Sequence, residues 1–330
     1  MRGVAIWLLC LGLAGCGRGG GTRLLFAGYT ASREVYHGTI IPAFRRAWQA
    51  KTGQTLIIDE SYLASGAQSR AIVGGFEADV AALSLEPDLD RLVAAGLVKH
   101  DYHQAPHRGV VATSLVAMAV RPGNPRHIVD FADLARPGVE VLLPNPRISG
   151  GAMWNAAALW GAALARTGRA DAAEDFLRSV LANVSVMDRG ARESLVTFEQ
   201  GIGEVAVTYE SEILAGRAAG RHYDEIVSEV GLIVECPAAL VDTYVDEHGS
   251  RAAAEALIAF LHGPEAQAAL VAHGFRPAEY APVPGRPEPR RAWRVAERGG
   301  WTKLREQLFG DRGAWTRASE QAQAQGQRRK

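Results

Sequence analysis

The sequence lacks an excess of charge of either sign. Its 330 residues include 36 Lys and Arg and 36 Asp and Glu, so the formal net charge is zero. A chain without a positive excess has no long-range field to attract nucleic acid or an acidic membrane surface. We therefore expect no nucleic-acid partner, and any anion that the chain binds must be held by local geometry.

Catalytic and metal-binding signatures are also missing. The sequence has no Gly-x-Ser-x-Gly elbow, no phosphate loop ending in Gly-Lys-Ser/Thr, no paired cysteines and no His-Glu-x-x-His motif. His100, His103 and His107 form the one histidine cluster, and a solvated loop accounts for their spacing better than a metal site does. The sequence predicts no enzyme activity, no cofactor and no metal.

Long apolar runs are absent except at the N-terminus. The run from Val4 to Leu13 is too short to span a bilayer and has the form of a secretory signal. It ends in Leu13-Ala14-Gly15-Cys16, which resembles a bacterial lipobox. We predict a signal peptide at residues 1–15, a lipidated Cys16, and a flexible tether at 16–23. The protein would then be anchored in the periplasm or on the outer face of the cytoplasmic membrane. The alternative is a plain signal peptide with an incidental cysteine.

Only three cysteines are present, Cys10, Cys16 and Cys236. If Cys10 leaves with the signal and Cys16 carries lipid, no disulfide remains possible in the mature chain. Cys236 is then expected to be a small buried apolar residue.

Short apolar runs alternate with amphipathic segments in the rest of the chain. Buried strands are predicted at residues 24–27, 56–58, 80–83, 139–143 and 204–207. Predicted helices lie between them; one ends at Gly53, one ends at Gly168, and one starts with a capping box at Asp171. Repeated strand-then-helix order predicts an α/β fold of parallel sheets covered on both faces.

Two longer apolar strands, at 113–121 and 238–245, interrupt this alternation. They could be crossings between two lobes, which the chain length favours, or members of one large sheet. The two-lobe interpretation assigns residues 24–112 plus 240–330 to lobe 1 and residues 113–239 to lobe 2.

Several predicted strands run directly into a hydroxyl or glycine residue that opens a helix. These starts contain Thr30, a capping box from Ser65 to Gln68, Ser149-Gly150-Gly151, and Gly190-Ala191-Arg192. A helix start presents unpaired N–H groups and a partial positive charge, so it can bind an anion. Each one alone is more simply a helix cap. As a set they would converge at the carboxyl edge of the sheets, where ligands bind in α/β folds.

The same stretches carry a family resemblance. The sequence is similar to the sulfate-binding proteins of bacterial ABC importers, from about Leu24 to the helix near Trp315. The matching stretches are 28–34, 59–61 with 65–66, 76–80, 121–125, 144–155, 188–192, 201–205 and 275–277.

The resemblance implies a type II periplasmic-binding-protein fold: two lobes, each a mostly parallel sheet flanked by helices, joined by two crossing strands. It implies a monomer that binds sulfate or a related oxyanion between the lobes and delivers it to the permease subunits of an ABC importer. Its implied backbone donors are Thr30, Ser65, Gly150, Gly151 and Ala191. The implied side-chain donors are Ser149 and Tyr209, and Arg192 would lie behind the anion, paired with a carboxylate such as Asp79.

The chain departs from the family at Tyr209, where a tryptophan is usual. A phenol replaces an indole, so thiosulfate, molybdate and phosphate stay open beside sulfate. Phosphate retains a proton at neutral pH and needs an acceptor, whereas sulfate needs only donors. We expect none of the four nearest carboxylates to contact the anion: Glu34, Glu60, Asp79 and Asp188. The same fold could also serve an oxyanion sensor lipoprotein or, with less support from the sequence, an exported enzyme.

Overall fold

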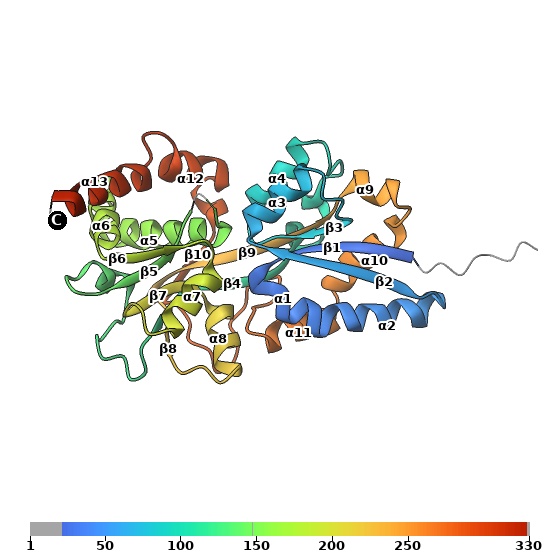
Figure 1. Cartoon of the computed structure of the whole chain (residues 1–330), viewed down its shortest axis with the longest axis horizontal. Helices are drawn as coiled ribbons and strands as arrows, with labels where there is room; N and C mark the ends of the chain where they lie inside the picture. The colour runs from blue at the N-terminus through green and yellow to red at the C-terminus, as the bar shows by residue number, and fades with distance from the viewer. Residues whose placement is uncertain (1–21, 147, 329–330) are drawn as a thin grey trace, which may run out of the picture.

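The computed structural model describes residues 22–146 and 148–328, with side chains up to 324 (Figure 1). The predicted signal peptide, Cys16 and most of the predicted tether lie outside these residues. Strand β1 (Thr22–Tyr29) already begins at Thr22, two residues before its expected start. Within the described residues, no helix combines the length and the apolar character that crossing a membrane requires.

The first lobe contains a parallel sheet in the order β2, β1, β3. Its strands are β1, β2 (Leu56–Leu63) and β3 (Val80–Ala82), with Phe26 opposite Val80. Its helices are α1 (Arg33–Val35), the π-helix Tyr36–Ile40, α2 (Ile41–Thr52), α3 (Ser65–Val73), α4 (Glu86–Ala94), α9 (Asp242–Glu247), α10 (Arg251–Leu261) and α11 (Pro264–Ala272). Helix α2 ends at Gly53 as predicted, because the left-handed backbone there, with φ of 72°, suits glycine.

Two long antiparallel strands, β4 (Val110–Val120) and β9 (Val230–Leu240), run through both lobes (Figure 1). Strand β9 pairs with β3 at its C-terminal end, and β4 pairs with β7 at its own. The first crossing was predicted nearly in place, but the second was placed about eight residues too late, since β9 ends at Leu240 and α9 occupies the second half of 238–245. Glu235 and Pro237 interrupt the apolar pattern of β9 and caused this error.

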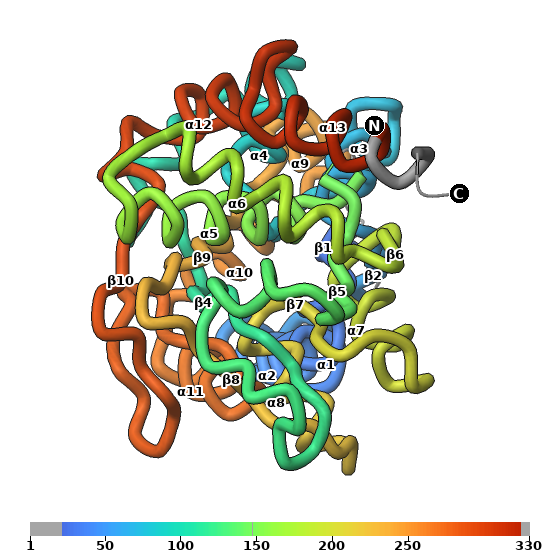
Figure 2. The backbone as a smooth tube through the Cα atoms, turned by 90° about the vertical axis from the view of Figure 1, so that its left-hand side faces the viewer, coloured from blue at the N-terminus to red at the C-terminus, as the bar shows by residue number. Residues whose placement is uncertain are grey.

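The second lobe has a sheet of β5 (Val141–Pro144), β6 (Val184–Asp188), β7 (Val205–Tyr209) and β8 (Asp224–Ile226) beside β4. Strand β5 is parallel to both β6 and β7. Its helices are α5 (Gly150–Thr167), α6 (Ala170–Ala182), α7 (Ala191–Glu199) and α8 (Glu210–Ala218). Helices α5 and α6 lie on one side of this sheet and α8 on the other, as Figure 2 shows. The expectation of mostly parallel sheets covered by helices is confirmed.

The C-terminal segment packs on the second lobe, which differs from the predicted division. It contains β10 (Arg291–Trp293), α12 (Gly300–Phe309) and α13 (Ala314–Arg328), and α13 lies along α6 (Figure 2). Trp301 packs edge-on against Trp154 with ring centroids 4.6 Å apart. Helices α12 and α13 each have an apolar face that must be buried. The sides of α5 and α6 that point away from the sheet cover it. Residues 291–328 therefore do not join the first lobe, as residues 240–330 were expected to.

One predicted helix cap is wrong. Helix α6 begins at Ala170 with Arg169 in the N-cap position, so Asp171 is inside the first turn. Its carboxylate pairs with Arg169 instead of capping the helix. Helix α5 ends at Gly168 as predicted, again in the left-handed conformation.

Candidate functional site

The start of α5 lies against the end of β7 and the start of α7. Ser149 caps α5, and its hydroxyl accepts a hydrogen bond from the Ala152 N–H at 3.4 Å. Gly150 and Gly151 are the first two helical residues, so their N–H groups have no acceptor within the helix. A Cβ atom added at Gly151 would lie 3.1 Å from the Tyr209 hydroxyl and 3.3 Å from the Ala191 Cβ. We call Ser149, Gly150, Gly151, Ala191 and Tyr209 the donor cluster.

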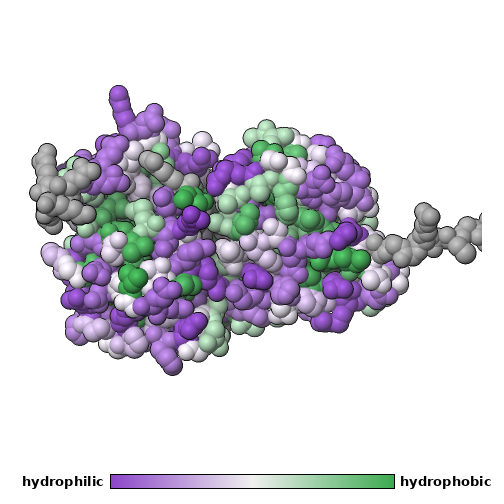
Figure 3. Space-filling view, in the orientation of Figure 1, coloured by the Kyte–Doolittle hydropathy of each residue, from purple (hydrophilic) through white to green (hydrophobic). Residues whose placement is uncertain are grey.

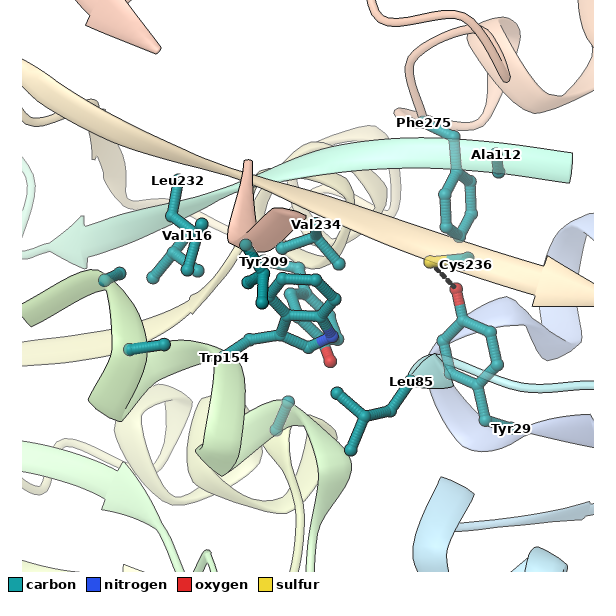
Figure 4. Close-up of a cluster of buried hydrophobic side chains, with 14 of the residues drawn as sticks. Tyr29, Leu85, Ala112, Val116, Trp154, Tyr209, Leu232, Val234, Cys236 and Phe275 are labelled. Carbon is teal, nitrogen blue, oxygen red and sulfur yellow. Dashed lines mark hydrogen bonds between the residues drawn. The ribbon is translucent and has the colours of Figure 1, made fainter. Parts of the chain in front are cut away.

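Tyr209, the last residue of β7, carries the hydroxyl of this cluster. The residue is 2% exposed, and its hydroxyl makes no hydrogen bond of normal geometry with the described protein atoms, although the Ser84 side chain is near it. Burial raises its pKa well above the usual value, against a smaller opposing effect of the nearby Ser84 hydroxyl, so the phenol stays neutral and keeps its proton. Tyr209 belongs to the buried cluster drawn in Figure 4, which also contains Trp154 and Leu85. A buried hydroxyl without a partner is costly unless a ligand or water completes it.

The first lobe approaches the donor cluster with two helix starts. Thr30 begins the short 3-10 helix Thr30–Ser32 at the carboxyl end of β1, and this turn contacts α7. Ser65 is the first residue of α3, which contacts α5. A Cβ atom added at Gly66 would lie 3.2 Å from the Ile148 carbonyl oxygen. All the predicted donors therefore lie where the two lobes touch.

The Ser65 side chain does not cap its helix, so the predicted capping box is wrong. Ala64 holds the N-cap position, and the Ser65 hydroxyl donates to Asp88 Oδ2 at 2.7 Å. Ser65 Oγ also accepts the Ser84 N–H at 3.1 Å, and Arg91 donates to Asp88 Oδ1 at 3.0 Å. The Ser65 oxygen thus accepts the Ser84 N–H instead of an N–H of its own helix, and its proton is directed to Asp88.

Ser84 and Asp88 were not predicted as site residues. A Cβ atom at Gly150 would lie 3.0 Å from Ser84 Oγ and 3.2 Å from Asp88 Oδ2, so both side chains adjoin the donor cluster. Ser84 follows β3 at the same sheet edge that Thr30 occupies after β1, and the rule used for Thr30 would have found it. Asp88 is within α4, where its sequence gave no comparable signal.

Arg192 and Asp79 are not paired, contrary to expectation. Arg192 Nε lies 2.5 Å from Glu212 Oε2, and its Nη2 lies 3.1 Å from Glu34 Oε2 across the lobe boundary. Burial alone would lower the pKa of Arg192, but the two carboxylates more than offset it and raise the pKa. Burial raises the pKa of Glu212 to about 7, against the opposing effect of Arg192.

Asp79 instead lies at the opposite edge of the first-lobe sheet. Its carboxylate accepts hydrogen bonds from Ser250 at 2.6 Å and from the Leu25 N–H at 2.6 Å, and it contacts His248 at 2.9 Å. The physical reason is its position in the chain. Asp79 precedes β3, so it lies at the amino edge, whereas ligand-binding turns follow strands.

The other residues singled out by sequence have protein partners. Glu60 contacts His37 and Tyr62, and Asp188 accepts from Thr197 at 3.1 Å. In the histidine cluster, His100 contacts Asp242 and His103 contacts Glu86. Among the described residues, no group of three or more His, Cys, Asp or Glu is arranged to hold a metal ion. Cys236 is buried as predicted and accepts the Tyr29 hydroxyl at 3.2 Å (Figure 4).

Two cavities in the structure have no donor-cluster residue in their lining. One of about 630 Å³ surrounds Asp79 and His248 at the amino edge, and one of about 500 Å³ lies between Glu86 in α4 and Trp301 in α12. Figure 3 shows a notch between the lobes on the face in view. The donor cluster is at a close contact of the lobes, which suits a ligand of only a few atoms.

Comparison with known proteins identifies the family of the chain. The bacterial extracellular solute-binding protein family matches residues 38–276. The chain belongs to this family. It is 38% identical to the sulfate-binding protein of Synechococcus elongatus, over 89% of this chain and 86% of that protein. It is 37% identical to the sulfate-binding protein of Escherichia coli, over 88% of this chain and 90% of that protein.

A thiosulfate-binding protein from Pseudomonas aeruginosa is 35% identical, with 77% of this chain and 78% of that protein covered. Among solved structures, the sulfate-binding protein SubI from Mycobacterium tuberculosis superposes with a TM-score of 0.79 at 33% identity. That match covers 87% of this chain and 99% of SubI. The chain is thus an extracytoplasmic solute-binding protein with the periplasmic-binding-protein fold, from a family of binding proteins and not of enzymes.

Proposed function

We propose that this solute-binding protein captures sulfate between its lobes and delivers it to an ABC importer. The observation that carries the proposal is the convergence of uncharged donors on one spot: the free helix-start N–H groups of Gly150 and Gly151, the Ser149 hydroxyl, and the unpartnered hydroxyl of Tyr209. The relatives that are named sulfate-binding proteins support it.

Physical chemistry supports a fully ionised anion in such a site. Sulfate has only acceptor oxygens, so every partner must be a donor, and backbone N–H groups at helix starts are fixed donors with a favourable dipole. The guanidinium of Arg192, the residue after Ala191, is paired with Glu212 and Glu34. Hydrogen bonds from fixed dipoles to a charged ligand are strong where water is excluded.

Binding would hold the lobes together. Thr30 and Ser65 come from one lobe and the donor cluster from the other, so an anion contacting both stabilises the closed arrangement. In this proposal the lobes open about β4 and β9. The proposal also includes a lipid anchor at Cys16, which would keep the protein near the permease subunits.

Isothermal titration of residues 22–330 with sulfate, thiosulfate, molybdate and phosphate tests the proposal. We expect sulfate to bind with a Kd below about 1 μM. Thiosulfate is the second ligand to measure, because the Pseudomonas aeruginosa relative is named for it. If none of the four anions binds, the proposed transport function is wrong. Mass spectrometry of the membrane-extracted protein, before and after Cys16→Ala, tests the anchor separately.

A further inference from the structure

The Ser84 hydroxyl comes from the first lobe and lies beside the start of α5 in the second. Ser84 follows β3 and is 2% exposed. The two polar atoms nearest to a Cβ position on Gly150 are Ser84 Oγ at 3.0 Å and Asp88 Oδ2 at 3.2 Å. Burial raises the pKa of Tyr209, and the hydrogen-bonding side chain that opposes this rise is that of Ser84. Two hydroxyls from opposite lobes therefore lie together beside the first N–H groups of α5.

The backbone of Ser84 is held from both lobes. Its N–H donates to Ser65 Oγ at 3.1 Å, and its carbonyl oxygen accepts the indole N–H of Trp154 at 2.6 Å. Trp154 belongs to α5, so this second bond joins the lobes. The indole is fully buried and packs against Trp301, so its N–H has a fixed direction. Neither bond uses the Ser84 hydroxyl, which remains directed at the donor cluster.

Asp88, the other polar side chain at this position, cannot supply a donor to an anion. Its Oδ1 accepts from Arg91 at 3.0 Å, and its Oδ2 takes the proton of the Ser65 hydroxyl at 2.7 Å. A carboxylate paired with a guanidinium only accepts hydrogen bonds, and the pairing offsets its charge. Sulfate has only acceptor oxygens. Of the two polar side chains nearest Gly150, the Ser84 hydroxyl is thus the one that can bind sulfate.

We propose that Ser84 is a further anion-binding residue, whose hydroxyl donates a hydrogen bond to sulfate from the first lobe. Trp154 is then a positioning residue: it touches no ligand but holds the Ser84 carbonyl, and so aims the hydroxyl when the lobes meet. The anion would be held by side-chain hydroxyls of both lobes, Ser84 from the first and Ser149 and Tyr209 from the second. The inference rests on the proposed function, because it concerns the same anion site.

The test is titration of residues 22–330 with sulfate for the wild type, Ser84→Ala, Trp154→Phe and the double variant. Ser84→Ala should weaken sulfate binding about tenfold or more, the effect of losing a hydrogen bond to a charged ligand. Its melting temperature without ligand should stay close to that of the wild type, because both bonds of Ser84 use backbone atoms. Ser250→Ala is the control: this buried first-lobe serine donates to Asp79, so its loss should lower stability without changing sulfate affinity.

The double variant tests the part played by Trp154. Trp154→Phe keeps an aromatic ring and loses the N–H, so it should weaken sulfate binding about threefold to tenfold while Ser84 is present. In the Ser84→Ala background the same change should weaken binding by less than about twofold, because no hydroxyl is left to position. Equal losses in the two backgrounds overturn the positioning role.

The remaining outcomes separate the two proposals. Sulfate binding by the wild type with unchanged affinity in Ser84→Ala overturns the role of Ser84 and leaves the proposed function standing. A weakened Ser84→Ala whose ligand-free melting temperature falls as far as that of Ser250→Ala also overturns it, since the serine would then act on folding. Absence of binding by the wild type overturns the proposed function, and this inference with it. If circular dichroism shows that Trp154→Phe does not fold, Ser84→Ala alone decides.

Discussion

The two lobes contribute to the site in different ways. The second lobe presents groups with free hydrogen-bonding capacity: the first N–H groups of α5 and the hydroxyl of Tyr209. Several polar groups of the first lobe are bonded to one another: the Ser65 hydroxyl donates to Asp88, its oxygen accepts the Ser84 backbone N–H, and Arg91 donates to Asp88. In the proposed binding mode, the second lobe therefore supplies donors that contact the anion, and the first lobe closes over it.

The largest expected effect comes from the ion pair that joins the lobes. Arg276 follows α11 of the first lobe and donates to both oxygens of Glu210, at 2.7 and 2.8 Å, at the start of α8 in the second. Both side chains are fully buried, and burial raises the pKa of Glu210 despite the guanidinium. Arg276→Ala should lower the free energy of unfolding by about 3–5 kcal/mol, because it leaves a buried carboxylate unpaired.

Urea denaturation measures this loss. Arg169→Ala is the control, since Arg169 forms an exposed pair with Asp171 and its loss should change stability little. Equal effects of the two variants would show that the buried pair does not hold the lobes together.

A single methyl group at Gly151 would fill the space between the residues of the donor cluster. A Cβ at Gly151 would meet the Tyr209 hydroxyl at 3.1 Å and Ser149 Oγ at 3.3 Å. Gly151→Ala should therefore weaken sulfate binding roughly a hundredfold, since it pushes apart the groups that surround the anion. Gly38→Ala is the matched control, because its Cβ would meet nothing within 4 Å. Titration of both variants with sulfate checks the result, and equal affinities would place the anion elsewhere.

The sequence predicted elements better than it predicted side-chain partners. Strand and helix positions follow from periodicity and from glycines such as Gly53 and Gly168, which are local properties. The pairing of Asp79 with Arg192 failed because it depends on which edge of the sheet each residue occupies. The cap assigned to Ser65 failed because the side chain's partners, the Ser84 N–H and Asp88, are 19 and 23 residues away and reach it only in the folded chain.

Placement of the C-terminal helices failed for a similar reason. Their amphipathic pattern shows that one face is buried but does not say against which lobe, and contacts such as the Trp154–Trp301 pair decide this. The places of the donor-cluster residues in the fold were predicted more completely, because these residues lie at helix starts and strand ends that the sequence marks directly; their contact with an anion stays a prediction.

Two serines distinguish the roles of the lobes. Ser149→Ala should cost roughly 1–3 kcal/mol of sulfate binding, the scale of a hydrogen bond to a charged group. Ser65→Ala should change affinity by less than about 1 kcal/mol and act mainly on stability, because its hydroxyl is bonded to Asp88 and its N–H remains. Titration and thermal melting of both variants measure the two effects. A larger affinity loss in Ser65→Ala would contradict the division of roles.

The smallest effect is expected at the amino edge of the first-lobe sheet, away from the donor cluster. The hydrogen bond to Asp79 raises the pKa of His248 above its ordinary 6.5, with Glu77 adding to the effect. Because the folded pKa is the higher one, this contact stabilises the protein fully below about pH 6.5 and is lost as pH rises through the folded value. His248→Gln should therefore lower stability by under about 1 kcal/mol at low pH and by still less at pH about 9, since the side chain is one-third exposed.

Urea denaturation at both pH values measures this difference in stability, and sulfate affinity should not change. A stability difference that is constant with pH would refute the linkage, and an altered affinity would show that the amino edge does influence the site.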